Sequence, residues 1–148
     1  MADYGKILLA ADFSEFNAQT AERAQAVTAR LGAELSILHV VEPMPLGDPL
    51  YGAILPFDFD LSGQMAALAQ ARLAEMAENL NVPASRQWVE IGSPKVEIVR
   101  VAKERGIDLI VIGTHGRHGV AALLGSTASS VVHHAGCDVL TVRLKDVG

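Results

Sequence analysis

The sequence contains a single cysteine, Cys137, and no run of lysine or arginine. One cysteine excludes a disulfide within the chain and is typical of a reducing compartment, where Cys137 is expected to act as a small buried hydrophobe. The net charge is −5, with 12 basic residues dispersed along the chain. This balance argues against binding to nucleic acid or to an anionic membrane, because both require clustered positive charge.

Long apolar runs are also absent. No stretch approaches the ~20 apolar residues that span a bilayer. The first residues, "MADYGKILLAAD", lack the basic segment and signal-length apolar core of a signal peptide. We therefore expect a cytoplasmic protein without membrane insertion.

Several common nucleotide-binding motifs are missing. A dinucleotide-binding fold requires G-x-G-x-x-G after its first strand, but residues 11–16 read "ADFSEF". A P-loop requires Gly-Lys-Ser/Thr, whereas the Gly5-Lys6 pair precedes an apolar strand. A response-regulator receiver would have an aspartate where residues 90–94 read "EIGSP".

Five short segments rich in Val, Ile and Leu alternate with segments of helical periodicity. Apolar runs of this length predict strands, and near-continuous ones predict parallel strands covered on both faces. The strands are expected at 6–11 ("KILLAA"), 34–41 ("ELSILHVV"), 86–91 ("RQWVEI"), 107–113 ("IDLIVIG") and 138–143 ("DVLTVR").

Each helical segment has start and stop signals. Apolar positions at helical spacing, including Leu31 and Leu68, are expected to face the core. Helices are expected to start at Ser14, Ser62, Ser93 (followed by Pro94) and Ser126, and three of them to stop at Gly32, Gly106 and Gly136.

This alternation predicts an α/β fold: a doubly wound, five-stranded parallel sheet in the order 3-2-1-4-5, with helices on both faces. No repeat or linker divides the chain, so residues 1–148 are expected to form one domain. The stretch 42–61, "EPMPLGDPLYGAILPFDFDL", breaks the rhythm. It is interpreted either as a lid that orders on ligand binding or as a surface loop packed by its own side chains.

A doubly wound sheet binds ligands where the strand order reverses, at the carboxyl ends of its strands. Here the reversal falls between the first and fourth strands, so Asp12 should face the stretch "GTHGRHGVAALLGS" (113–126). Glycines let backbone N–H groups approach an anion, and a helix that starts near Gly125 favours negative charge. The alternative for Asp12 is a carboxylate that only stabilises the start of the next helix.

Over its whole length the chain resembles a universal stress protein. The matching segments are "KILLAADFSE", "ILHVVEP", "GIDLIVIGTHGRHG" and "LLGSTASSVVHHAGCDVLTVR". The resemblance implies an adenine nucleotide alpha hydrolase-like fold and a homodimer formed through the last strand, 138–143. It further implies a stress-response regulator. The alternative for this edge strand is protection from pairing by Arg143 and Lys145.

One branch of that family binds ATP and another has lost the nucleotide. The ATP-binding branch carries G-x2-G-x9-G-[ST], and here eight residues, rather than nine, separate Gly116 from Gly125. The resemblance implies ATP or another adenine nucleotide as ligand, with or without Mg²⁺. The residues implied are Asp12 and Val40 or Val41 at the adenosine end, and Gly113, His115, Gly116, Gly125, Ser126 and Thr127 at the ribose and phosphates.

Two other functions stay open. The shortened loop favours a nucleotide-free dimeric adaptor, and a weak ATPase would require Asp12 and His115 to meet near the γ-phosphate. No nucleophile–base pair is evident, so we do not expect an enzyme beyond slow ATP hydrolysis. A zinc site is not expected, since His133 and His134 are adjacent on a helix and cannot point the same way. His39 is expected to be a hydrogen-bonded core residue.

Overall fold

The computed structural model describes residues 4–43, 61–114 and 125–145 of the 148-residue chain. Its five strands form one parallel sheet in the order β3-β2-β1-β4-β5, which confirms the predicted fold class and strand order. The strands are β1 (Lys6–Ala10), β2 (Glu34–Val41), β3 (Gln87–Ile91), β4 (Leu109–Gly113) and β5 (Asp138–Val142).

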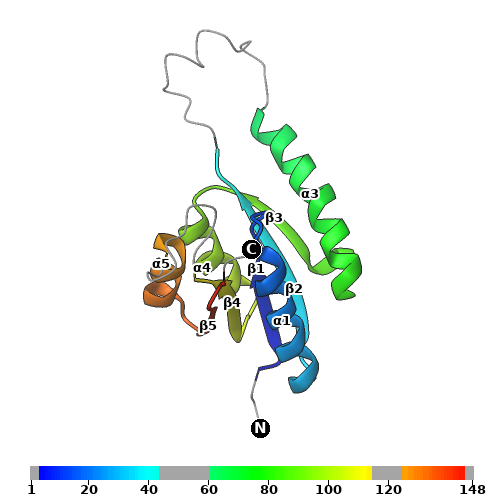
Figure 1. The fold of residues 1–148 in the computed structure, drawn as a ribbon. Coiled ribbons are helices and arrows are strands. Elements are labelled where there is room, and N and C mark those ends of the chain that lie inside the picture. The colour runs from blue at the N-terminus through cyan, green and yellow to red at the C-terminus, as the bar shows by residue number, and fades with distance from the viewer. Residues whose placement is uncertain (1–3, 44–60, 115–124, 146–148) are drawn as a thin grey trace.

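Helices cover both faces of this sheet (Figure 1). One face carries α1 (Asn17–Leu31) and α3 (Leu61–Leu80), and the other carries α4 (Pro94–Glu104) and α5 (Ser126–His134). A short 3-10 helix, η1 (Ala84–Arg86), precedes β3. Within the described ranges, no helix is both long and apolar enough to cross a membrane.

Two apolar clusters hold the layers together because side chains of a strand alternate between its faces. In β1, Ile7 and Leu9 pack under α1 and α3, while Leu8 packs under α4 and α5. All three are fully buried. Cys137, predicted to be buried, is only half-buried against the second cluster. Burial raises the pKa of its thiol, which favours the protonated form.

Several helix boundaries follow the predicted signals. Gly32 ends α1 in the left-handed conformation, with φ of 63°, which glycine adopts without steric cost. Ser93 precedes α4 and Pro94 occupies its first turn. The last helix begins at Ser126 as predicted, whereas α3 begins at Leu61, one residue before the predicted start.

Three expectations were wrong. Helix α1 starts at Asn17 rather than at Ser14, because Ser14 is part of a turn whose carbonyl accepts a hydrogen bond from Asn17 N–H. Leu31 and Leu68 are exposed rather than packed in the core. On α3 the buried positions are instead Ala69, Leu73 and Ala77.

Gly113, at the end of β4, is required by packing. A Cβ atom added there would lie 2.8 Å from Leu144 Cδ1 and 2.9 Å from Thr20 Oγ1. Both neighbours are buried, so they have little room to move.

Gly113→Ala is therefore expected to lower the free energy of unfolding by about 1–3 kcal/mol, the usual cost of overpacking. Chemical denaturation of the protein without ligand would measure it. Gly136→Ala is the matched control, because a Cβ there meets nothing within 4 Å and the backbone has no positive φ that would strain alanine. Equal stability of the two variants would show that Gly113 is not constrained by its neighbours.

Candidate functional site

The reversal of strand order lies between β1 and β4, as predicted. The chain leaves β1 through Ala11 and Asp12 and leaves β4 through Thr114. The strands are parallel neighbours, so both exits lie at the same edge of the sheet. This edge is where doubly wound sheets bind ligands.

Asp12 is exposed at this edge and is held in a local turn. Its Oδ1 atom accepts hydrogen bonds from the Ser14 N–H, at 2.9 Å, and from the Ser14 hydroxyl, at 2.6 Å. The Ser14 hydroxyl in turn accepts a bond from Phe16 N–H. Within the part of the chain that the structure describes, Asp12 Oδ2 accepts no hydrogen bond. The carboxylate is therefore oriented by one oxygen and can accept from a ligand through the other.

Hydrogen bonds and a ring contact fix the positions of the residues on either side of Asp12. Before it, Ala11 N–H donates to Leu38 C=O at 2.8 Å, and Ala11 C=O accepts from His39 Nδ1, also at 2.8 Å. After it, the Phe13 ring stacks on the His39 ring with centroids 4.1 Å apart. The prediction that His39 is a hydrogen-bonded residue is confirmed, although it is half-buried rather than fully buried.

The Phe13 ring also contacts a residue of α3. The Arg72 guanidinium carbon lies 4.4 Å from the Phe13 ring centroid, a cation–π geometry worth about 0.5–1 kcal/mol at an exposed site. Sequence reasoning missed this stack of His39, Phe13 and Arg72. An aromatic residue directly after Asp12 was a signal for Phe13, but Arg72 is 59 positions further along the chain and had none.

Val40 and Val41 lie at the carboxyl end of β2, with both side chains buried. The register pairs Ala10 with Leu38, so Val40 lies at the level of Asp12, two residues further along each strand. The Val41 C=O already accepts a hydrogen bond from Gly92 N–H. Their position beside Asp12 agrees with the predicted site, and their buried side chains leave the backbone as the part that a ligand could reach.

On the β4 side, a backbone hydrogen bond joins the two ends of the glycine-rich stretch. Gly125 N–H donates to Thr114 C=O, and Thr114 N–H donates to Val142 C=O. The chain therefore leaves β4 and enters α5 at adjacent points. His115 and Gly116, two of the predicted site residues, lie outside the described residues.

Helix α5 begins at Ser126, directly after Gly125. Its first intrahelical bond runs from Ser129 N–H to Gly125 C=O. Within the described ranges, the N–H groups of Ser126, Thr127 and Ala128 have no hydrogen-bond partner, as at a typical helix start, where the dipole also favours negative charge. Ser126 is exposed and Thr127 is half-buried. The N–H of Gly125, one of the residues predicted at the phosphates, is not among these free donors, because it donates to Thr114 C=O.

The chain is similar to known proteins over nearly its whole length. The model of the universal stress protein family matches residues 3–143. The chain belongs to this family. It is 38% identical over 146 residues to universal stress protein A homolog 2 of Coxiella burnetii, covering 98% of this chain and 99% of that relative.

Solved structures of universal stress proteins have the same fold. UspA from Lactobacillus plantarum superimposes with a TM-score of 0.78 at 28% identity, covering 97% of this chain and all of the other. A universal stress protein solved in complex with cAMP has a TM-score of 0.67 at 22% identity, covering 95% and 97% of the two chains. The second similarity concerns the fold alone.

Among the described residues, no three His, Cys, Asp or Glu side chains gather as metal ligands would. Away from the switch point, Arg100 ion-pairs with Glu90, Glu97 and Glu104. The hydrogen bond from Arg100 to Glu97 is the largest cause of the raised pKa of the arginine, followed by that to Glu90. This cluster joins α4 to β3 and has a net charge of −2, because one arginine pairs with three glutamates.

Proposed function

We propose that this universal stress protein is a cytoplasmic, homodimeric regulator that binds ATP or another adenine nucleotide at the switch point between β1 and β4. The observation that carries the proposal is the convergence of Asp12 with the start of α5 at one edge of the sheet. Asp12 supplies a hydrogen-bond acceptor, and α5 supplies backbone donors and a favourable dipole for phosphate.

The residues present are chemically suited to such a ligand. Asp12 Oδ2 can accept from a hydroxyl or amino group of the adenosine end, beside the β2 backbone at Val40 and Val41. The N–H groups of Ser126 and Thr127, with their hydroxyls, can donate to phosphate oxygens. The cAMP complex of another universal stress protein supports the proposal only at the level of the fold, which can accommodate an adenine nucleotide.

Thermal unfolding with MgATP tests this proposal. Binding to the native state adds about 2.7 kcal/mol of stability at a ligand concentration a hundredfold above Kd. For a chain of this size, that free energy raises Tm by about 5–10 °C. Inorganic triphosphate with Mg²⁺ and GTP are the controls for unspecific anion binding. An unchanged Tm and no heat on titration at millimolar MgATP would contradict nucleotide binding.

A nucleotide-free adaptor of the same fold is the second candidate, favoured by a specific observation. Two glycines of the family's ATP motif already make contacts within the protein. Gly113 is required by packing against Thr20 and Leu144, and Gly125 N–H is bonded to Thr114. The spacing between the last two glycines of the motif is also one residue short. Adenine absorbance that co-purifies with the protein and is released on denaturation would exclude the adaptor.

We do not propose an enzyme beyond slow ATP hydrolysis. The Ser14 hydroxyl donates to the Asp12 carboxylate, but it also accepts from Phe16 N–H and so belongs to the local turn. Phosphate release that exceeds background and disappears in Asp12→Ala would revise this. The proposed cytoplasmic location rests on the single cysteine, which excludes a disulfide within the chain and is typical of a reducing compartment.

A further inference from the structure

A groove separates α1 from α3 on their shared face of the sheet. Its volume is about 590 Å³, and its walls are the first half of α1, between Asn17 and Gln25, and the second half of α3, between Arg72 and Leu80. Figure 1 shows α3 inclined away from α1, with its first turns projecting beyond the sheet. The groove begins at Phe13, the residue that follows Asp12.

The two walls are joined weakly. Among the described residues, two side-chain hydrogen bonds connect the helices. Asn17 Nδ2 donates to the weak acceptor Met76 Sδ at 3.5 Å, and Gln25 Nε2 donates to Asn79 C=O at 3.4 Å, near the long limit for an N–H···O bond. On the α1 side, the lining includes the exposed Ala18 and the buried Ala21. Their small side chains leave the space unfilled.

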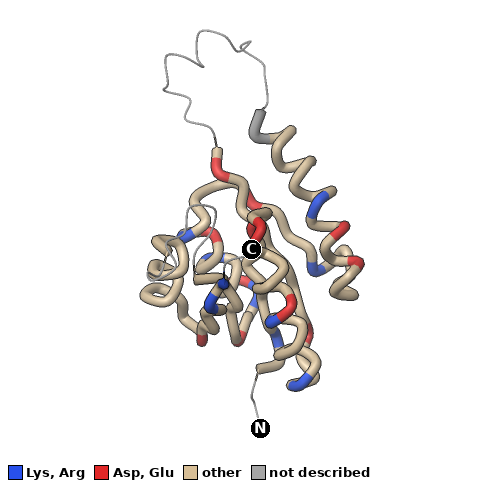
Figure 2. The backbone as a smooth tube through the Cα atoms, in the orientation of Figure 1, with Lys and Arg blue, Asp and Glu red and all other residues tan. Residues whose placement is uncertain are grey.

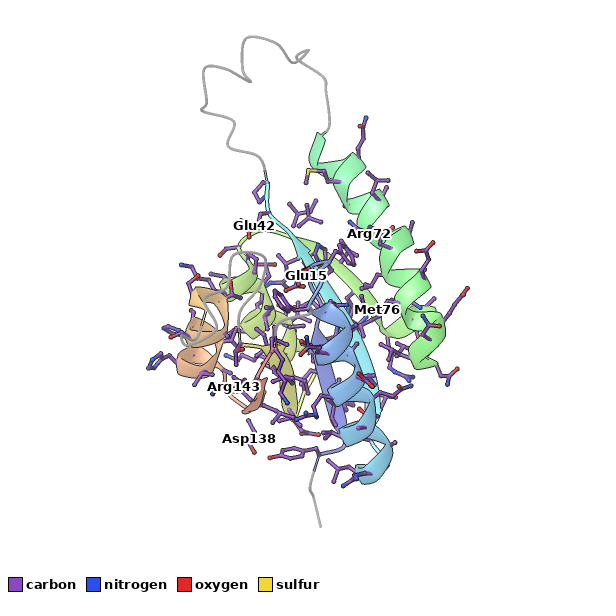
Figure 3. The ribbon with its side chains drawn as sticks, viewed as in Figure 1. Glu15, Glu42, Arg72, Met76, Asp138 and Arg143 are labelled. Atoms are coloured by element: carbon purple, nitrogen blue, oxygen red, sulfur yellow. The ribbon has the colours of Figure 1, made fainter. Side chains whose placement is uncertain are left out.

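The groove combines an apolar floor with an acidic rim. Met76 and Leu80 contribute apolar surface from α3, and Glu15, Glu22 and Glu75 contribute carboxylates. The lining has one cation, Arg72, and its guanidinium is placed over the Phe13 ring. Figure 3 shows Arg72 and Met76 on α3 and Glu15 in the turn that precedes α1. Figure 2 shows how acidic and basic positions are distributed along the two helices.

The apolar surface continues along α3 beyond the groove. Leu68 is 67% exposed, the most exposed of the large apolar side chains in the described residues. It lies one helical turn before Arg72 and seven residues before Glu75, so the helical period places it on the same side of α3 as the groove wall. An exposed leucine beside an apolar, acidic-rimmed groove is the pattern of an interaction surface.

We infer that this groove docks an amphipathic helix of a partner protein, with apolar residues on one face and lysine or arginine along its borders. The charge of the rim determines the sign of the partner's charge. The groove lining has three glutamates and one arginine, and that arginine already contacts the Phe13 ring. The adjacent segment 44–60 of this chain has three aspartates and no lysine or arginine, so it does not complement the rim. A second copy pairs at the β5 edge in the proposed homodimer, and its net charge of −5 does not complement the acidic rim.

A defined probe tests the inference. A fluorescein-labelled 14-residue peptide of leucine and lysine in helical register is titrated with the protein and followed by anisotropy. A peptide of the same pattern with glutamate in place of lysine is the charge-reversed control. We expect the lysine peptide to bind more than tenfold more tightly than the glutamate peptide, and to weaken with rising salt. Equal binding of the two peptides would overturn the inference.

Two matched variants locate the binding. Glu75→Lys reverses a rim charge, whereas Glu78→Lys makes the same change in net charge on the same helix but outside the groove lining. Because it replaces attraction with like-charge repulsion, Glu75→Lys is expected to weaken the lysine peptide about tenfold, and Glu78→Lys less than twofold. Ala18→Trp, at an exposed position, fills the groove and should also abolish binding.

Amide chemical shifts of the protein show whether the peptide, or instead a second copy of the chain, occupies the groove. Peptide-induced shifts confined to the facing halves of α1 and α3 support the inference, and shifts centred on another surface overturn it. Shifts of the groove residues that appear with rising protein concentration, without peptide, would assign the groove to a second copy and also overturn it. Because no nucleotide is present, this result is independent of the proposed nucleotide binding.

Discussion

Asp12→Ala is expected to weaken adenine-nucleotide binding roughly tenfold to a hundredfold while changing the free energy of unfolding by less than about 1 kcal/mol. A hydrogen bond to a charged group contributes about 1.5–3 kcal/mol, and each 1.4 kcal/mol is a factor of ten in affinity. The cost to the fold is small because the carboxylate is exposed and bonds only to nearby Ser14. Titration calorimetry with MgATP measures the first quantity and chemical denaturation the second.

Asp12→Asn separates the two roles of this side chain. Asparagine keeps an acceptor oxygen for the Ser14 N–H and hydroxyl, so the turn is retained while the negative charge is lost. Weakened binding in both variants would assign the effect to the carboxylate. Native-like affinity in Asp12→Asn with a loss only in Asp12→Ala would assign it to the turn. Unchanged affinity in Asp12→Ala would refute the proposed ligand role.

The fold was predictable because its signals are local. Apolar runs of strand length and helix-breaking glycines lie within a few residues of the boundaries that they determine, and β2 has its predicted bounds, Glu34–Val41. The strand order followed from general rules for parallel sheets. Ser14 failed as a helix start because the carboxylate of Asp12 competes for its N–H and hydroxyl. Residues that favour helix caps also favour such turns.

Periodicity also misplaced Leu31 and Leu68, for a different reason. It identifies the apolar side of a helix but not how much of the helix lies over the sheet. Leu31 is the last residue of α1 and lies beyond its buried positions, Thr20, Ala21 and Ala24. Leu68 directly precedes the buried Ala69 and lies on the side of α3 that carries Arg72, so its spacing marks a helix face other than the buried one.

The candidate site was predictable as a location and only partly as a set of contacts. Asp12 and the end of β4 were brought together by the topology, which the sequence pattern indicates. The stack of His39, Phe13 and Arg72 was not, because it joins residues from β2, the loop after β1 and α3. It depends on the rotation of α3 about its axis. No pattern in a single sequence reports that rotation.

The exposed edge of β5 is where we expect a single substitution to change the oligomeric state. Thr114 N–H donates to Val142 C=O, so the backbone groups of Val142 face β4. Successive residues of a strand alternate, and the N–H and C=O groups of Val139 and Thr141 therefore face away from the sheet. In the proposed homodimer these outward groups pair with a second copy, as unprotected sheet edges do.

Thr141→Pro is expected to convert the dimer into a monomer. Proline removes the outward N–H of residue 141, and two-fold symmetry repeats the loss in the partner. The ladder to β4 keeps its bonds because residue 141 does not donate to it, and proline is tolerated on edge strands. Analytical ultracentrifugation should show the mass fall from twice the chain mass of 15.7 kDa to the chain mass itself, with a folded circular dichroism spectrum.

Thr141→Val is the matched control, since valine keeps the N–H and favours strand structure. It should remain dimeric, which would attribute the effect of proline to the missing donor rather than to the lost hydroxyl. A native protein that sediments as a monomer would instead support an edge protected by Arg143 and Lys145, both exposed beyond β5. A Thr141→Pro variant that stays dimeric would place the interface on another surface, because an edge pairing cannot retain its symmetric bonds without that N–H.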